Sequence, residues 1–212
     1  MPYLVKDPMK IKEQAGLRGE EEVYFRLANY SKSRALIYGM VTRFAYRVGK
    51  GSREVDLIYI NKKGVFVIEI KNWGGVIKGG ISDPKWLQMK RSETVELKNP
   101  VQQIKKHVND VREFLGNNYP VFPLVVFIKN NVKNIKVPIV INFDELVPYL
   151  DYLNVSQHLK DSEIKKIEEL LELIKSRDSV SINEHKRNAI NAKHLHKKPQ
   201  DDVLKLVRSY RK

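Results

Sequence analysis

The chain has 212 residues, 42% of them hydrophobic, which is enough to bury the core of one ordinary domain or at most two small ones. Thirty-nine Lys and Arg against 25 Asp and Glu give a net charge of +14. That balance favours a polyanionic partner, nucleic acid before membrane, over a basic surface with no specific partner. The absence of cysteine excludes disulfides and thiolate zinc sites and favours a reducing cytoplasm.

The sequence carries no recognisable membrane or export signal. No segment approaches the roughly 18 consecutive apolar residues that a transmembrane helix needs. The N-terminal stretch MPYLVKDPMKIKEQ is charged where a signal peptide requires an apolar segment. We therefore expect a cytoplasmic protein with no membrane partner.

Residues 14–32 predict a helix, because Val23, Leu27 and Tyr30 recur at helical spacing. Glu20 falls on the same stripe, among side chains that should face a core. A carboxylate there is costly to bury unless it is ionised beside a cation or neutralised. An acid in the first turns of a helix also complements the helix dipole. Both interpretations of Glu20 stay open from the sequence.

Strands follow this helix. Residues 34–48 mix β-branched and aromatic side chains and predict an edge strand. Residues 54–60 and 65–71 predict two further strands, joined by a hairpin loop over 61–64 that ends in Gly. Paired glycines bracket one more short strand at residues 76–78.

The second half of the chain alternates helices and strands. Asn99 and Pro100 mark a helix start, as N-cap and first helical residue, and an apolar face then runs from Val101 to Leu115. Two buried strands and two helices follow, at 120–128, 137–142, 143–150 and 162–175. This order predicts an α/β fold in which helices flank a mixed central sheet.

We assign residues 1–180 to this domain and residues 181–212 to a basic C-terminal tail or short helical extension. A solvated tail and a helical hairpin that helps to grip an anion are both consistent with its composition. His194 and His196 lack a cysteine or an acid at ligand spacing, which argues against a metal site in this segment.

Asp56, Glu69 and Lys71 interrupt the most apolar stretch of the sequence. Alternate residues of a strand share a face, so Glu69 and Lys71 should point the same way. The loop at 61–64 is centred midway between 56 and 69, which places Asp56 opposite Glu69 with side chains roughly 4.5–5.5 Å apart. Two carboxylates at that spacing repel each other unless a cation lies between them.

This pattern indicates a divalent metal site. A hard cation such as Mg²⁺ takes one or two carboxylates and fills its other positions with water and substrate phosphate. The backbone carbonyl of Ile70 would add a ligand, and Lys71 would orient or deprotonate a metal-bound water of lowered pKa. The opposing interpretation is a surface ion pair between Glu69 and Lys71, worth roughly 0–1 kcal/mol. The flanking apolar residues favour the metal site.

Five short motifs occur in the order and at about the spacing of one protein family. They are Gly16-Leu-Arg-Gly19-Glu20, Glu54-Val-Asp56, Glu69-Ile-Lys71-Asn-Trp73 followed by Gly75, Trp86, and Asn99-Pro-x-x-Gln103. Across about residues 14–130 the chain therefore resembles the nuclease-related domain (NERD) family, a branch of the PD-(D/E)XK nuclease superfamily.

The resemblance implies a restriction-endonuclease-like α/β fold around a mixed central sheet. It also implies Asp56, Glu69 and Lys71 as the catalytic triad, with Glu20 as an acid from the first helix that reaches the same site. Gly16 and Gly19 would let that helix approach the sheet closely, with simple helix capping as the alternative. The predicted metal ligands are thus the side chains of Asp56, Glu69 and Glu20 and the Ile70 carbonyl.

Gln103 and His107 lie four residues apart on one predicted helix face. The pair resembles the Gln-x-x-x-Tyr arrangement of some related nucleases, which puts an amide and an aromatic donor beside the substrate strand. Because His107 replaces the tyrosine, a solvent-facing histidine is the favoured interpretation, and contact with nucleic acid is the other.

Four further side chains bear on nucleic-acid binding. Lys105 and Lys106 on the same helix are candidate contacts, because phosphates attract lysine. Trp73 and Trp86 would either stack on bases or pack partly buried, and packing is favoured.

These features predict a metal-dependent nuclease, with Mg²⁺ or Mn²⁺ as cofactor, that hydrolyses DNA with low sequence specificity. They favour an endonuclease over an exonuclease. The alternative is a non-catalytic nucleic-acid-binding or accessory module of a DNA-processing or replicon-maintenance system. RNA as a substrate, a homodimer, and a helicase or other DNA-processing partner all stay open.

Overall fold

The computed structural model describes residues 8–48 and 51–191, without the side chains of residues 8–13, 176 and 178–191. The chain divides into two compact units. The first unit comprises Met1–Leu36, Ile68–Lys105 and Pro123–Asn154, and the second comprises Ile37–Val67, Lys106–Phe122 and Val155–Lys212. No helix in the described part of the chain has the length and apolar character needed to span a membrane.

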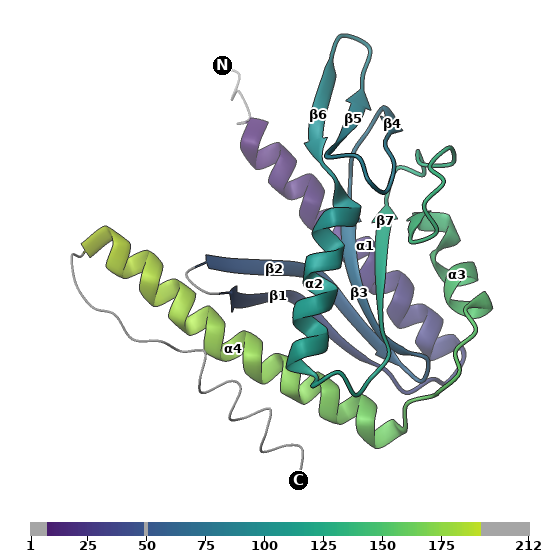
Figure 1. Cartoon of the computed structure of the whole chain (residues 1–212), viewed down its shortest axis with the longest axis vertical. Coiled ribbons are helices and arrows are strands. Elements are labelled where there is room, and N and C mark those ends of the chain that lie inside the picture. The colour runs from purple at the N-terminus through teal and green to yellow at the C-terminus, as the bar shows by residue number, and fades with distance from the viewer. Residues whose placement is uncertain (1–7, 49–50, 192–212) are drawn as a thin grey trace, which may run out of the picture. The chain divides into compact units, whose positions relative to one another are not determined.

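Eight strands and five helices follow one another along the described chain (Figure 1). The strands are β1 (Gly39–Val48), β2 (Gly51–Asn61), β3 (Gly64–Lys71), β4 (Val76–Lys78), β5 (Lys85–Met89), β6 (Thr94–Lys98), β7 (Val121–Phe127) and β8 (Val140–Asn142). The helices are α1 (Pro8–Ser33), α2 (Pro100–Phe114), the 3-10 helix η1 (Phe143–Glu145), α3 (Leu146–Tyr152) and α4 (Asp161–Asn191).

The strands form a five-stranded sheet in the order β1-β2-β3-β7-β8 and a three-stranded sheet in the order β4-β5-β6. The larger sheet is mixed, because β1 and β2 pair antiparallel whereas β7 and β8 pair parallel. β1 lies at its edge, as predicted. The α/β fold class is therefore confirmed, and the architecture is consistent with a restriction-endonuclease-like fold.

In the second unit, β2 leads into β3 through a tight turn at Lys62 and Lys63. The side-chain oxygen of Asn61 accepts a hydrogen bond from the Lys63 N–H at 2.8 Å. Gly64 closes the turn with a φ of +142°, and a Cβ there would lie 2.6 Å from the carbonyl oxygen of Pro120. Only glycine fits this position, which confirms the predicted hairpin loop.

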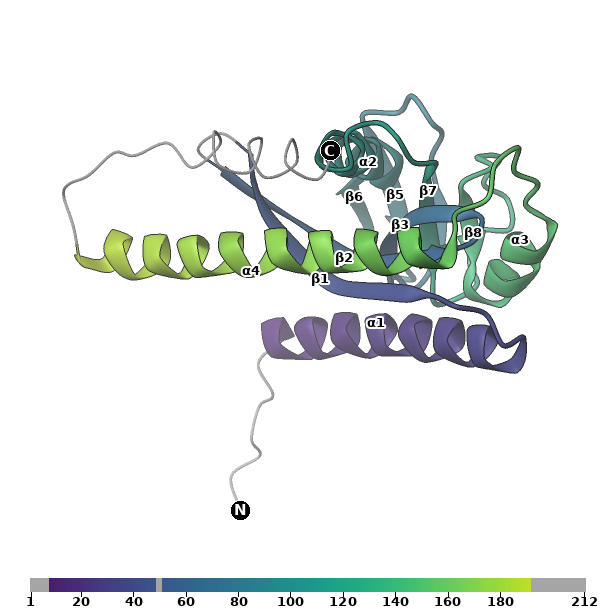
Figure 2. The same ribbon diagram turned by 90° about the horizontal axis from the view of Figure 1, so that it is seen from below.

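α4 runs alongside β1 in the same unit (Figure 2). The carboxylate of Glu168 accepts the Met40 N–H at 2.8 Å, and a Cβ on Gly39 would lie 2.9 Å from Glu168 Cδ. The helix therefore approaches β1 at a residue that has no side chain. The predicted apolar stripe is buried: Ile164, Ile167, Leu170, Leu171 and Ile174.

The last helix of the described chain is longer than the predicted helix at 162–175. α4 continues to Asn191, so the proposed domain boundary at residue 180 falls inside one helix. The remainder of the proposed tail, with His194 and His196, lies outside the described residues.

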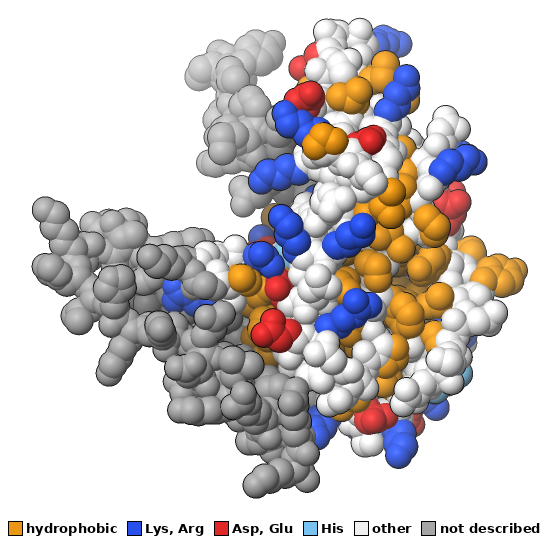
Figure 3. Space-filling view, in the orientation of Figure 1, with side chains coloured by type: hydrophobic (Ala, Val, Ile, Leu, Met, Phe, Trp, Pro, Cys, Tyr) orange, Lys and Arg blue, Asp and Glu red, His pale blue; other side chains and the backbone are white. Residues whose placement is uncertain are grey.

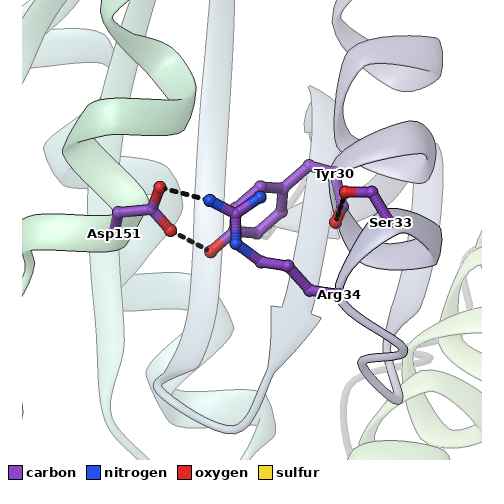
Figure 4. Close-up of polar contacts among 4 residues, drawn as sticks. All are labelled: Tyr30, Ser33, Arg34 and Asp151. Atoms are coloured by element: carbon purple, nitrogen blue, oxygen red, sulfur yellow. Dashed lines mark hydrogen bonds and ion pairs between the residues drawn. The ribbon is translucent and has the colours of Figure 1, made fainter.

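In the first unit, α1 is joined to α3 by polar contacts at Asp151 (Figure 4). The Tyr30 hydroxyl donates to Asp151 Oδ1 at 3.0 Å, and the Arg34 guanidinium donates to Oδ2 at 2.7 Å. Arg34 also lies over the Tyr30 ring, 4.5 Å from its centroid, and Ser33 Oγ donates to the Tyr30 carbonyl at 2.9 Å. The predicted helix stripe of Val23, Leu27 and Tyr30 is buried.

β4, β5 and β6 of the first unit lie between β3 and α2 in the chain and form the antiparallel three-stranded sheet. The sequence predicted β4 but not β5 and β6. These two strands have five residues each, and only one face of each is covered. So short a pattern, with Lys and Glu on the other face, resembles a polar loop in the sequence alone.

Candidate functional site

The end of β3 carries two charged side chains in an apolar setting. Every residue from Gly64 to Ile70 is buried, and Glu69 is only 2% exposed. The ammonium of Lys71 donates a hydrogen bond to the Glu69 carboxylate, and the Lys71 side chain is 15% exposed. The two side chains therefore share a face, as strand alternation predicted, and form a largely buried ion pair rather than a surface one.

α2 adds an amide to this pair. Lys71 Nζ lies 3.4 Å from Gln103 Oε1, at the long end of hydrogen-bond range. The same ammonium lies 5.4 Å from the centroid of the Trp73 ring, within cation–π distance. Lys71 is thus held among a carboxylate, an amide oxygen and an aromatic face, all within the first unit.

The start of α2, which sets the place of Gln103, is fixed by Asn99. Its side-chain oxygen accepts the N–H of Val101 at 2.8 Å and of Gln102 at 3.4 Å, so the predicted N-cap is confirmed. Its amide group donates to the carbonyl oxygens of Gly80 and Asp83 at 3.2 and 2.6 Å. One buried side chain therefore orients the helix and ties it to the loop before β5.

α1 reaches the end of β3 through Gly19. A Cβ on this residue would lie 3.1 Å from Ile128 Cγ1 and 3.7 Å from the Asn72 side chain. Asn72 also donates to the Ala15 carbonyl at 2.7 Å. The predicted close approach is confirmed for Gly19 but wrong for Gly16, because a Cβ there would meet no described atom within 4 Å.

Glu20 follows Gly19 and is half-buried. α1 thus carries this acid beside the residue that packs against Asn72 and Ile128, and the backbone of Ile128 donates to the Lys71 carbonyl at 3.0 Å. The acid therefore comes from the part of α1 that approaches the end of β3.

Asp56 lies on β2 in the second unit, half-buried between the buried side chains of Val55 and Leu57. Lys105 and Lys106 are exposed on α2, the former in the first unit and the latter in the second. The pairing of Asp56 with Glu69 stays a prediction of the hairpin register.

His107 differs from the sequence interpretation. Its side chain is 4% exposed, so the favoured solvent-facing histidine is wrong. Its Nδ1 lies 2.8 Å from the Tyr46 hydroxyl, which donates to Asp110 Oδ2 at 2.8 Å. Because the hydroxyl has a single proton, the bond to Asp110 leaves His107 Nδ1 as the donor in its own bond to Tyr46.

Arg53 completes this cluster by donating to the same Asp110 carboxylate, opposite Tyr46 on the paired strand. Burial, and then the hydrogen bond to Asp110, hold the pKa of Tyr46 well above its usual range. The separate hydrogen bond that Arg53 donates to Asp110 raises the pKa of Arg53. The four side chains lock β1, β2 and α2 of the second unit together. One signal of the cluster is visible along the chain, the i, i+3 spacing of His107 and Asp110 on α2.

Both tryptophans pack against other side chains, which is the interpretation favoured over base stacking from the sequence. Trp86 is fully buried, nearly parallel to the Phe127 ring at 6.2 Å between centroids, and donates to the Gly80 carbonyl at 3.0 Å. Trp73 is half-buried and meets the same ring edge-on at 5.5 Å. Trp73 is therefore the one of the two with an accessible surface.

The oxygen donors at this site suit one kind of metal ion. Among the described residues, no three His, Asp or Glu side chains gather into a group that could hold one. Carboxylate and backbone carbonyl oxygens are nevertheless the ligands that Mg²⁺ prefers, and it commonly keeps several waters with only one or two carboxylates. The chemistry of the donors therefore fits a hydrated hard cation rather than a closed metal site.

A family model described as nuclease-related domain matches residues 15–128 of the chain. An uncharacterized protein of Bacillus anthracis is 30% identical over 74 residues, which are 35% of this chain and 35% of that protein. The match thus spans about a third of that relative's length. No solved structure matches the chain.

Proposed function

Because the chain belongs to the nuclease-related domain family, we propose that it is a metal-dependent nuclease that hydrolyses DNA phosphodiester bonds with low sequence specificity. We further propose that it cuts internally rather than from strand ends. The observation that carries the proposal is the buried Glu69–Lys71 ion pair at the end of β3. A carboxylate that is 2% exposed, beside an ammonium, gives a site where charge is weakly screened by solvent.

The carboxylate ligands in this proposal are Glu69 and Asp56. A two-residue turn between Asn61 and Gly64 favours the register in which Asp56 faces Glu69, since turn length sets the pairing of a hairpin. The Ile70 carbonyl supplies a third oxygen. We assign Glu20 an indirect part through a bound water, because no three acids of the described chain form a metal-holding group.

When bound, Mg²⁺ or Mn²⁺ would supply a water of lowered pKa and positive charge for the phosphate. Lys71 Nζ has three donor hydrogens, of which one is directed at Glu69 and a second, at the long end of hydrogen-bond range, at Gln103. The third can orient the attacking water or contact a phosphoryl oxygen. Gln103 and Trp73 restrict the position of that ammonium and thereby its direction.

We propose Gln103, Trp73, Lys105 and Lys106 as the nucleic-acid contacts of α2 and the β3 end, and His107 as a residue that supports them. The exposed ammonium groups of Lys105 and Lys106 suit phosphates, and the accessible side of Trp73 suits a base. The buried His107 would act through Tyr46 and Asp110, by holding α2 in place. Binding of this kind is driven by contacts to the phosphate backbone of the nucleic acid, so its affinity should fall strongly as the salt concentration rises.

The test is incubation with linear, nicked and supercoiled DNA in the presence of Mg²⁺, Mn²⁺ or EDTA. We expect the wild-type chain to cut in either metal, and Lys71→Ala and Glu69→Gln to lose cutting. Lys32→Ala, an exposed lysine near the end of α1, is the matched control and should cut like the wild type. DNA that is bound but uncut in every condition would favour the non-catalytic nucleic-acid-binding module instead.

A further inference from the structure

The three-stranded sheet β4-β5-β6 has one covered face and one open face. Ile77, Trp86 and Gln88 are buried on the covered face. The register places the alternate residues together on the other face, which we call the outer face: Val76, Lys78, Lys85, Leu87, Met89, Thr94, Glu96 and Lys98. All of these except the half-buried Met89 are exposed. The outer face is therefore an accessible surface of lysine and aliphatic side chains.

Two lysines face each other directly on this surface. Lys85 of β5 is the register partner of Lys98 of β6. Like charges directly opposite on a sheet are destabilising. Glu96 offsets this only in part, because its ion pair with Lys85 is 61% exposed on the Glu96 side and 59% on the Lys85 side. An external anion bound between Lys85 and Lys98 would remove the repulsion.

The sheet is tied at both ends to the elements that carry Lys71 and Gln103. Gln88 Nε2 donates to the Gly74 carbonyl at 2.8 Å, three residues after Lys71. Asn99 ties the loop before β5 to the start of α2, four residues before Gln103. The three-stranded sheet that would carry a ligand on its outer face is therefore hydrogen-bonded to the two segments that lead to Lys71 and Gln103.

A second segment with several lysines, the loop after β7, is hydrogen-bonded to the chain between β3 and β4. Asn131 Nδ2 donates to the carbonyl oxygens of Trp73 and Gly75 at 2.8 and 2.7 Å. This holds the loop after β7, with exposed Lys129, Lys133 and Lys136, against the segment that leads into β4.

Charge gathers over these two segments. Residues 72–98 and 128–138 contain eight Lys or Arg and three acids. Two of those acids are already engaged, Glu93 with Lys90 and Glu96 with Lys85. Figure 3 shows basic side chains over the region where β4, β5 and β6 lie in Figure 1, with apolar and a few acidic side chains among them.

We propose that the outer face and the loop at Lys129–Lys136 form a surface that binds the phosphate backbone of duplex DNA and feeds it to the Glu69–Lys71 site. This inference rests on the proposed nuclease function. Duplex is favoured over single-stranded DNA because the outer face presents no aromatic side chain for base stacking, and Trp86 of β5 points to the covered face. Phosphates of a duplex need only the ammonium groups.

The test measures binding separately from cleavage. The full-length triple variant Lys78→Gln/Lys85→Gln/Lys98→Gln is titrated in EDTA against a fluorescent duplex and its single strand at several salt concentrations. The control variant Lys32→Gln/Lys160→Gln/Lys165→Gln removes the same charge from other exposed positions. The Lys→Arg triple at the outer face keeps the charge, and circular dichroism melting checks that each variant is folded.

We expect wild type to bind duplex more tightly than single strand. The outer-face Gln triple should lower the slope of log affinity against log salt by about 2 to 3, at about 0.9 per lost phosphate contact. The control triple and the Arg triple should keep the wild-type slope. An unchanged slope in the Gln triple, an equal loss in the control triple, or tighter binding to single strand would each overturn the surface.

The aliphatic residues among the lysines make an anionic lipid surface the competing partner. Vesicles of phosphatidylserine with phosphatidylcholine provide that arm, and binding to them that duplex does not displace would overturn the DNA surface. The nuclease proposal and the binding surface can be rejected independently of each other. Duplex binding that responds to the Gln triple without any metal-dependent cutting supports the surface and rejects the nuclease, whereas cutting with unaltered binding does the reverse.

Discussion

The Lys71 ammonium donates a hydrogen bond to the Glu69 carboxylate two residues earlier on β3. Both side chains are removed from most of their solvent, at 15% and 2% exposure. A buried charge that loses its partner keeps the cost of desolvation without the compensating attraction. The stability of the end of β3 and the chemistry proposed for it therefore depend on the same pair.

Lys71→Met should destabilise the chain by up to about 3–5 kcal/mol, the loss typical when one partner of a buried pair is removed. The double variant Glu69→Gln/Lys71→Met should lose less, because no uncompensated carboxylate remains. Urea unfolding at neutral pH measures the three free energies. A double variant less stable than Lys71→Met would contradict the charge argument.

The effect of added Mg²⁺ on the free energy of unfolding tests whether Glu69 is a metal ligand, and this measurement does not depend on cleavage. If Glu69 is a metal ligand, a divalent cation can replace the lost ammonium as its counter-charge. Added Mg²⁺ should therefore raise the unfolding free energy of Lys71→Met more than that of wild type, by mass action on the folded state. Glu69→Gln should show no such gain, and equal gains in all variants would argue against a metal at Glu69.

The Tyr46 cluster predicts sensitivity to alkaline pH. Burial and the bond to Asp110 raise the Tyr46 pKa in the folded state, so the folded chain binds this proton more tightly than the unfolded chain. The stability from this proton is complete below about pH 10, the ordinary tyrosine pKa, and declines above it by at most about 1.4 kcal/mol per pH unit. Urea unfolding between pH 9 and about pH 11 should show this decline in wild type.

Tyr46→Phe should flatten that decline and also cost about 1–3 kcal/mol at neutral pH, since Asp110 and His107 lose a buried partner. Some decline should persist, because burial also raises the pKa values of Tyr119 and Tyr149. Tyr152→Phe, at a tyrosine that is 83% exposed, is the matched control and should follow wild type. The same decline in Tyr46→Phe and wild type would remove Tyr46 as its source.

Local patterns predicted the elements in which burial dictates residue type. β3 is buried from Gly64 to Ile70, so its apolar run, with Glu69 and Lys71 as exceptions, was visible in the sequence. Alternation placed Glu69 and Lys71 on one face, and their ion pair agrees with it. α2 was equally visible, because a cap residue and a helical stripe both lie within a few residues of each other.

The features that could not be predicted depend on contacts between residues that are far apart in the sequence. Tyr46 and His107 are 61 residues apart, and nothing near His107 indicates that a hydroxyl will cover its ring. Gly16 and Gly19 look alike in sequence, but only Gly19 faces Ile128. β5 and β6 do alternate between covered and exposed residues, but over only five residues each, and Phe127, which stacks on Trp86 of β5, is remote along the chain.

Asn99→Ala should cost about 2–4 kcal/mol, the sum of a lost N-cap and of buried carbonyls left without a donor. Asn99 is 3% exposed and serves Val101, Gly80 and Asp83 at once. Asn99→Ser should recover only the cap, because its short hydroxyl side chain does not reach the loop carbonyls. Urea unfolding gives the order, and equal stability of the Ala and Ser variants would show that the cap contributes nothing.

Gly74 and Gly75 provide a neighbouring pair for testing the link between β3 and β4. A Cβ on Gly75, which has a φ of +78°, would lie 2.3 Å from the Met89 carbonyl oxygen, and the Gly75 carbonyl accepts from Asn131. A Cβ on Gly74 would meet no described atom within 4 Å. Gly75→Ala should therefore cost about 1–3 kcal/mol from strain, whereas Gly74→Ala should stay within about 0.5 kcal/mol of wild type.

Because this link ties the three-stranded sheet to the end of β3, Gly75→Ala should also weaken duplex binding while Gly74→Ala leaves it unchanged. Thermal melting and duplex titration of the two variants measure both effects, and equal behaviour of the pair would mean that the backbone at Gly75 relaxes without strain.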